Sequence, residues 1–194
     1  MAESILETAT AVMSENGAAA LSLGEVARRL GIKTPSLYVY FDSRNGICDE
    51  LFRRGWSSFR RNQDYSPLKS AEDLADRTRR AIFDEVTWAN VHRAAAELMF
   101  WRPIPGWRPS SESFAPALEA MEDFTQLVED AQDRGILRSD VGSNEIAQVF
   151  AALIAGVISQ QLSNEPGTAA RDGRVSQFAE SMAAMFVQFY RSTQ

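Results

Sequence analysis

The clearest pattern of apolar and polar positions lies between residues 22 and 44. Three apolar side chains recur there at helical spacing: Val26, Ala27 and Leu30. Ser22 and Glu25 stand at the spacing of a capping box, in which each side chain accepts a hydrogen bond from the other residue's backbone N–H. Gly31 follows where the helix must end, because a residue without Cβ enters the left-handed conformation at little cost. The pattern predicts a short helix closed by a glycine turn.

A second short helix is predicted directly after this turn, over about residues 35–40. Thr34 is placed to cap it, and Pro35 suits its first turn, where a missing N–H loses no intrahelical bond. Leu37 and Phe41 lie four positions apart on one face and are expected to point toward the core. The other side chains stay available to a partner: Lys33, Thr34, Ser36, Tyr38, Val39 and Tyr40.

The rest of the chain is also predicted to be helical. Ser43 is placed to cap a longer helix over residues 44–61, and Pro67 with polar neighbours predicts a linker after it. Later helices are predicted over five ranges: 71–88, 91–101, 114–134, 143–162 and 174–190. We find no alternating strand pattern. The expected fold is therefore all-α.

Composition adds limits to this picture. A chain of 194 residues with 45% hydrophobic residues can bury a sizeable core, as one compact domain or two small ones. We find no continuous apolar run of about 18 residues and no basic-then-apolar leader, so we expect a cytoplasmic protein without a membrane partner. The lone Cys48 excludes an intramolecular disulfide, and we expect it to be a small packed residue.

The net charge of −6 over the whole chain argues against a nucleic-acid partner, but the charge is unevenly distributed between its two parts. Residues 1–62 carry eight basic and seven acidic residues, a balance of +1, whereas residues 63–194 carry twelve and nineteen, a balance of −7. Local field matters more than total charge, so the first part can still approach DNA. Four arginines near its end fit either role, phosphate contact or the solvated face of a connecting helix: Arg53, Arg54, Arg60 and Arg61.

Catalysis finds little support in the sequence. The chain has one histidine and one cysteine, and it lacks a glycine-rich phosphate loop, ligands at metal spacing and a GxSxG nucleophile motif. Glu119, Glu122 and Asp123 are close together but are expected on the solvent face of a helix. We therefore expect no enzyme activity, no cofactor and no metal.

Several short motifs follow one another between residues 6 and 51. They are Ala9, Val12 and Met13 on an amphipathic first helix, Asn16-Gly17, Ser22, Val26, Ala27, Gly31-Ile32, Leu37 to Phe41 and Ser43-Arg44. In this order they resemble the N-terminal domain of the tetracycline-repressor (TetR) family of transcription regulators. The resemblance implies about nine helices in two parts. Residues 1–45 would form a three-helix DNA-binding domain of the helix-turn-helix type, a helix over about 44–62 would connect, and residues 63–194 would bind ligand and dimerise.

The resemblance also implies roles at matching positions. Thr34, Pro35 and Ser36 would face base edges in the major groove. The implied phosphate contacts are Ser22, Lys33, Tyr38, Tyr40 and Arg44. Two departures weaken the match, because no Arg or Lys precedes Arg28 to form a basic arm and Val39 stands where arginine is common.

The same resemblance implies a homodimer that binds a palindromic operator. Apolar residues cover much of the last two long helices, and similar regulators pack such a pair against its symmetry mate. The expected interface residues are Val149, Leu153, Gly156, Val157, Phe178, Met182, Phe186 and Phe189. Intramolecular packing must account for part of this surface.

The expected activity is that of a repressor that a small apolar or aromatic ligand releases from DNA. Candidate ligand contacts in the middle of the chain are Trp88, His92, Phe100, Trp101, Trp107 and Phe124, although each also suits a plain core. Trp107, beside Pro105-Gly106, is a candidate pocket lid. The alternative is a DNA-binding regulator without a small-molecule effector, controlled by a protein partner. A drug-sized apolar cavity would disfavour that alternative, and a filled core would favour it.

Overall fold

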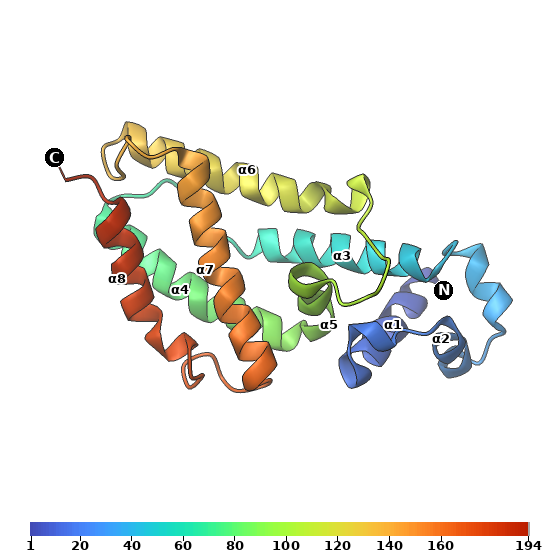
Figure 1. Ribbon diagram of the computed structural model, residues 1–194. Helices are drawn as coiled ribbons and strands as arrows, with labels where there is room; N and C mark the ends of the chain where they lie inside the picture. Colours follow the sequence, from blue (N-terminus) through green and yellow to red (C-terminus); the bar gives the residue numbers. More distant parts are fainter. Residues whose placement is uncertain (194) are drawn as a thin grey trace. The chain divides into compact units, whose positions relative to one another are not determined.

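The computed structural model describes residues 1–193, and within this range every regular element is helical (Figure 1). The elements in chain order are α1 (Ala2–Asn16), η1 (Ala18–Ala20), α2 (Leu23–Leu30), η2 (Thr34–Val39), α3 (Arg44–Arg61), α4 (Ala71–Val91), α5 (Arg93–Ala96), η3 (Glu97–Trp101), α6 (Ser111–Asp133), α7 (Ser143–Asn164), η4 (Ser176–Phe178) and α8 (Ala179–Tyr190). Strand-like pairing in the described residues is limited to one isolated antiparallel bridge between Leu137 and Arg191. The all-α prediction is confirmed.

The nine predicted helical segments correspond to observed ones. The range 91–101 holds two pieces, α5 and the π-helical turn η3, and the range 174–190 holds η4 followed by α8. The predicted linker separates α3 from α4, and Ser43 caps α3 as expected, since its Oγ accepts the N–H of Gly46 at 3.2 Å.

The chain forms two compact units, and each contains two separate stretches of sequence. Unit 1 comprises residues 1–58 and 92–117, and unit 2 comprises residues 59–91 and 118–194. The middle segment 92–117 therefore packs with the N-terminal helices. The predicted boundary between the DNA-binding part and the part from residue 63 onward concerns function. The two packing units do not test it, because each unit combines segments from before and after residue 63 or from both sides of the middle segment.

Unit 1 is organised by an aromatic cluster on α3. The ring of Phe52 is fully buried and lies 5.7 Å from the ring of Trp107 and 5.9 Å from that of Phe114. The indole N–H of Trp107 donates to Oδ1 of Asp49 at 2.8 Å. Trp107 is thus a buried packing residue rather than a lid, because its ring and its N–H are both engaged within the unit.

Cys48 is fully buried on the same helix. Burial raises the pKa of its thiol to about 11, so the reactive thiolate is scarce near neutral pH. The expectation of a small packed residue is confirmed.

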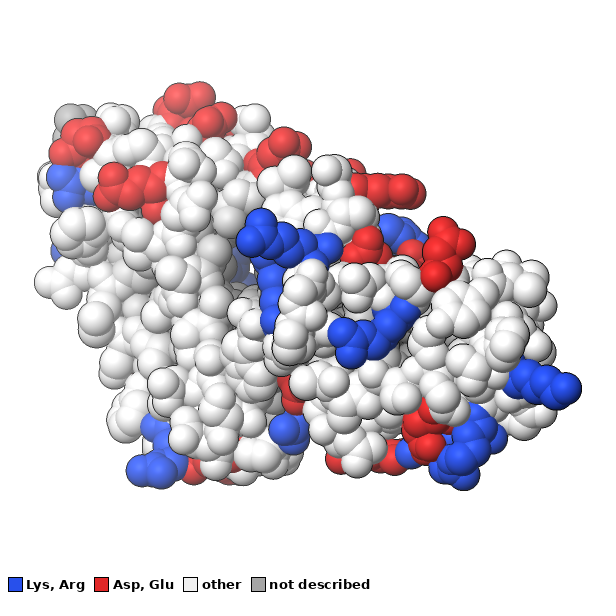
Figure 2. All heavy atoms as spheres, turned by 45° about the vertical axis from the view of Figure 1, so that its right-hand side comes forward, with Lys and Arg blue, Asp and Glu red and all other residues white. Residues whose placement is uncertain are grey.

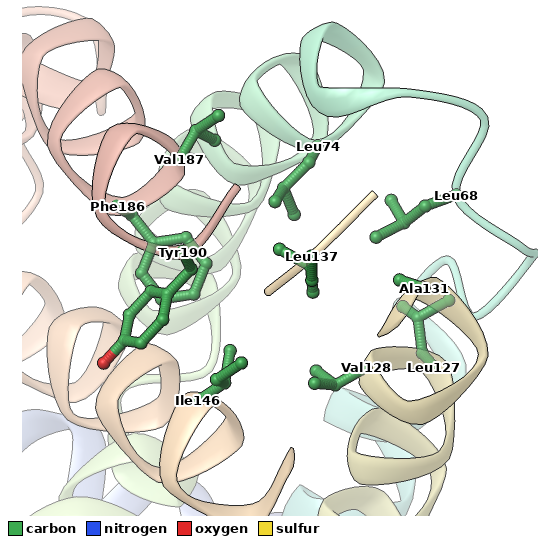
Figure 3. Packing of buried hydrophobic residues seen from close by; sticks show 10 residues of the cluster. All are labelled: Leu68, Leu74, Leu127, Val128, Ala131, Leu137, Ile146, Phe186, Val187 and Tyr190. Carbon is green, nitrogen blue, oxygen red and sulfur yellow. The ribbon is translucent and has the colours of Figure 1, made fainter. Parts of the chain in front are cut away.

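Unit 2 is built around α4, which packs against both α7 and α8 (Figure 1). Its core gathers side chains from four helices and from two loops: Leu68, Leu74, Leu127, Val128, Ala131, Leu137, Ile146, Phe186, Val187 and Tyr190. Figure 3 shows these side chains converging on the space around Leu137. Burial of this apolar surface is the main force that holds the four helices together.

Helix α7 has a mean hydropathy of 1.5 over its most apolar window, and by length and composition alone it would suffice to cross a membrane. The absence of a continuous apolar run did not reveal this, because polar residues such as Gln148 and Gln160 interrupt the window. In the structure 39% of that window is buried, and fully buried Ile146 and Ile158 place one face of α7 in the core of unit 2.

Candidate nucleic-acid interface

The turn between α2 and η2 has the predicted glycine geometry. Gly31 adopts the left-handed conformation, with φ 67° and ψ 26°. Its N–H donates to the carbonyl of Arg28 at 3.2 Å, and the N–H of Ile32 donates to that of Ala27 at 3.0 Å. These two bonds satisfy carbonyls that the end of α2 would otherwise leave open.

The predicted capping box is wrong. Ser22 occupies the N-cap position with an extended backbone, but its side chain makes no capping hydrogen bond. The Glu25 carboxylate instead accepts from Arg28 at 2.8 Å and from Arg29 at 2.7 Å. The guanidinium groups carry a full positive charge, which a backbone N–H lacks, and their hydrogen bonds lower the pKa of Glu25 to about 2.

The second element, η2, is a 3-10 helix and begins one residue earlier than predicted. Lys33, not Thr34, is its N-cap, and no side chain caps it. The first bond runs from the N–H of Ser36 to the carbonyl of Lys33 at 2.9 Å, and Pro35 lies in the first turn as expected. Fully buried Leu37 anchors the element to the core.

Anchoring by Leu37 turns the rest of η2 outward. Val39 is 79% exposed, and Tyr38 and Tyr40 are about half exposed. Pro35 and Ser36 are also exposed, whereas Thr34 is half-buried. The element therefore presents two hydroxyl-bearing rings, a hydroxyl and an apolar ring on one short projecting segment, which are groups that contact bases and phosphates.

Most arginines of this region are already paired with carboxylates. Arg28 and Arg29 bind Glu25, with Arg29 also on Glu15, and Arg53 and Arg54 bind Glu50, with Arg54 also on Glu3. Figure 2 shows such basic and acidic side chains next to one another on the drawn face. Of the candidate phosphate contacts, Lys33, Arg44 and Arg61 have no carboxylate within 4.0 Å among residues 1–193. Their charges are the ones left free for phosphate.

One supporting residue was missed by the sequence analysis. Glu97, at the start of η3, is 5% exposed, and its Oε2 accepts the N–H of Ala18 at 2.7 Å. Its Oε1 accepts from Arg93 at 3.0 Å. The carboxylate thereby ties η1, just before α2, to the middle segment. A single acidic residue in the apolar run AAAELMFW was the available signal.

The sequence comparison decides the family. The model of the bacterial regulatory proteins of the tetR family matches residues 5–51, the segment whose geometry is given above. Residues 5–51 carry the DNA-binding domain of the TetR family. The chain is a transcriptional regulator with the N-terminal DNA-binding domain of that family. A comparison with curated proteins gave no match.

Solved structures repeat the fold of the regulator over nearly its full length. A protein of unknown function from Rhodococcus sp. RHA1 has a TM-score of 0.76 at 20% identity, with 98% of this chain and 95% of that chain covered. FadR from Bacillus subtilis, solved in complex with stearoyl-CoA, has a TM-score of 0.71 at 14% identity and coverages of 95% and 97%. SmeT, the repressor of the Stenotrophomonas maltophilia multidrug efflux pump SmeDEF, has 0.70 at 21% identity and coverages of 100% and 91%. At these identities the likeness shows the fold.

The six candidate ligand contacts of the regulator are divided between the units. His92, Phe100, Trp101 and Trp107 belong to unit 1, and Trp88 and Phe124 belong to unit 2. Buried Trp88 packs edge-on against Phe59 at 5.3 Å. Phe124 stacks on Phe150 at 4.6 Å and lines a cavity of about 110 Å³ in unit 2. Among the described residues, no group of three or more His, Cys, Asp or Glu is placed to hold a metal ion.

The candidate interface residues on α7 and α8 fall into two classes. Val157 and Phe186 are buried within the protomer, since they lie on the core faces of their helices. Exposed or half-buried positions form the outer face: Val149, Leu153, Gly156, Phe178, Met182 and Phe189. Met185 extends this face and is 71% exposed. The apolar pattern alone did not separate the two faces, because both carry large apolar side chains.

Proposed function

We propose that this regulator is a repressor that binds a palindromic operator as a homodimer and leaves it when a small molecule binds. In this proposal residues 1–45 contact DNA, the helix over about 44–62 connects, and residues 63–194 dimerise and bind the effector. The observation that carries the DNA-binding role is the exposed η2 segment beside unpaired Lys33 and Arg44. A protein that binds chromosomal DNA in this way acts in the cytoplasm.

Each exposed group on this surface has a distinct role. The Lys33 ammonium and the Arg44 guanidinium neutralise phosphates, and the hydroxyls of Tyr38 and Tyr40 donate to phosphate oxygens. Ser36, at the exposed start of η2, is the group that contacts a base edge. Affinity then depends on the charged residues, whereas sequence preference depends on Ser36 and its neighbours.

Selection of bound sequences from random duplex DNA tests the proposal. We expect a palindrome whose half-sites are centred about 10–10.5 base pairs apart, or a multiple of that spacing. Arg44→Ala and Tyr38→Phe should weaken binding equally across sequences, whereas Ser36→Ala should change the preferred base. Lys69→Ala, which removes an exposed charge from the linker, is the matched control. Binding that is weak and fully competed by unrelated DNA would overturn the proposal.

A second copy of the chain is the partner that best suits the exposed face of α7 and α8. This face carries several large apolar side chains in contact with solvent, including Met185 and Phe189. They line a groove together with Val149, Leu153 and Met182. A two-fold dimer would cover the same face on both protomers and would present two copies of η2 to a palindrome.

Release by a small molecule depends on a cavity that can enclose it. The unit 2 cavity of about 110 Å³ is smaller than the roughly 300–1,000 Å³ of sites that enclose drug-sized ligands. This size keeps a second candidate open, a DNA-binding regulator controlled by a protein partner. Operator affinity measured across a broad ligand screen separates the two, because only a ligand-controlled repressor would lose affinity when a compound binds.

A further inference from the structure

The cavity in unit 2 is lined from the linker and from α4, α6 and α7. Its apolar wall consists of Leu68, Leu74, Leu127, Phe124 and Phe150. The first three also belong to the core cluster in Figure 3, so the cavity adjoins a well-packed region. The lining also includes Thr78 and Glu85, which lie on the same face of α4 as Leu74.

Two polar groups on this face of α4 lack hydrogen-bond partners. Glu85 is 3% exposed, and Gln63 donates its amide N–H to Oε1 while Oε2 has no partner. Thr78 is 1% exposed, and its Oγ1 also has none. The two residues are seven positions apart, about two helical turns, so they share one face of α4. Buried polar atoms are almost always paired, and two unpaired atoms in one cavity lining indicate an absent polar occupant.

Charge around the cavity favours a positive occupant. The lining holds three carboxyl groups, on Asp64, Asp84 and Glu85, against two guanidinium groups. One of these, on Arg77, already pairs with Asp64 and Asp73 at 3.4 and 3.1 Å and donates to the carbonyl of Ser66. The other guanidinium, on Arg80, belongs to an exposed residue. An anion would face the unpaired Oε2 at close range, whereas a cation would pair with it.

The aromatic and size constraints narrow the class of occupant. Phe124 and Phe150 line the same cavity as Glu85, and aromatic rings together with a carboxyl attract an organic cation. A cavity of about 110 Å³ is somewhat smaller than the ~150 Å³ that accommodates benzene. It therefore suits an amine head group with a short apolar stem rather than a whole drug-sized molecule.

We propose that this cavity binds the ammonium head of a lipophilic amine, with the ammonium N–H donating to Oε2 of Glu85 and the hydroxyl of Thr78 available to a second polar group. The proposal rests on the ligand-controlled repressor proposed above and names its ligand class. Burial raises the pKa of Glu85 to about 8, so a cation is also the occupant that would restore the ionised carboxylate near neutral pH.

Isothermal titration of the full chain without DNA tests this assignment with three probes that differ only in the head group: hexylamine, hexanol and hexanoate at pH 8.5. We expect hexylamine, which is protonated at this pH, to bind at least ~10-fold more tightly than either of the others. Glu85→Gln should remove this preference, whereas Glu122→Gln, which removes an exposed carboxylate that does not line the cavity, should keep it. Equal affinity for the three probes, tighter binding of hexanoate, or an unchanged preference in Glu85→Gln would overturn the proposal.

A second variant at position 85 and a measurement of operator binding complete the test. If Glu85→Gln does not fold, Glu85→Asp, which withdraws the carboxylate by one methylene, should reduce the preference for hexylamine by several-fold, and an unchanged preference would count against the site. A regulator that binds its operator but shows no ammonium preference refutes only this ligand class. A chain that binds hexylamine through Glu85 but no operator refutes only the proposed repressor.

Discussion

Replacing Glu85 by Gln should stabilise unit 2 in a strongly pH-dependent way, with no ligand present. Glu85 is buried on α4, and desolvation is the main cause that raises the pKa of its carboxyl from 4.5 to about 8. The hydrogen bond from Gln63 lowers that pKa, and the nearby Asp84 raises it. Other titratable or charged groups line the same cavity: Asp64, Tyr65, Arg77 and Arg80.

The size of the effect follows from the two pKa values. The folded pKa lies above the unfolded one, so between them the folded protein holds an extra proton and the free energy of unfolding falls as the pH rises. One pKa unit corresponds to about 1.4 kcal/mol, so the wild-type protein should lose about 4 kcal/mol between pH 5 and pH 9 at this site. Gln fills the same space and cannot ionise. The advantage of Glu85→Gln over wild type should therefore grow by about 4 kcal/mol across that range.

Urea denaturation at fixed protein concentration, followed by circular dichroism at pH 5, 7 and 9, measures this difference. Asp84→Asn removes an exposed carboxyl from the next residue and should show a much smaller trend. If the free-energy difference between Glu85→Gln and wild type is flat from pH 5 to pH 9, the carboxyl is not desolvated in the folded state. A buried Oε2 without a hydrogen-bond partner would then be excluded at Glu85.

Three further predictions concern the other surfaces. Val39→Arg should add one phosphate contact, so the slope of the logarithm of the DNA-binding constant against the logarithm of the salt concentration should steepen by about 0.9. Val91→Arg, at a similarly exposed position, should leave this slope unchanged. Equal slopes for the two variants in a filter-binding series would argue against a contact between η2 and DNA. Glu97→Ala should destabilise unit 1 by about 2–3 kcal/mol in thermal unfolding, because it leaves the buried N–H of Ala18 without its acceptor. Glu112→Ala, which removes an exposed glutamate, is the control. A loss of stability in Glu97→Ala no larger than in Glu112→Ala would contradict this prediction. Met185→Glu should raise the dimer dissociation constant at least ~100-fold in analytical ultracentrifugation, and an unchanged dimer would exclude this face as the interface.

The helix pattern of this chain was predictable because its signals are local. The left-handed Gly31, the Ser43 cap and the inward Leu37 each follow from residue type and spacing within a few positions, and all three are present. The Ser22–Glu25 box failed although its spacing was correct. Two arginines on the same helix compete for the Glu25 carboxylate, and spacing rules do not weigh such competition.

The candidate ligand residues were harder to predict for a different reason. Aromatic residues close together in the sequence were expected to share one pocket, but Trp107 packs on Phe52 in unit 1 and Phe124 lines a cavity in unit 2. Glu85 was not singled out at all, because a carboxylate on an amphipathic helix is usually solvated. Only the packing around α4 shows that this one is buried.

By itself, the sequence determined the all-α class, the helix-turn-helix and the family, because apolar periodicity and turn residues act within one or two helical turns. The tertiary structure decided which charges stay free around the exposed η2 segment, which face of α7 and α8 is exposed, and that Oε2 of the buried Glu85 has no partner. Exposure of one face of α7 and α8 and burial of Glu85 depend on contacts between residues far apart in the chain. The arginine pairs of Glu25 and Glu50 are local, with the arginine three or four positions away, but whether they form depends on competition between neighbouring groups, which spacing alone does not settle.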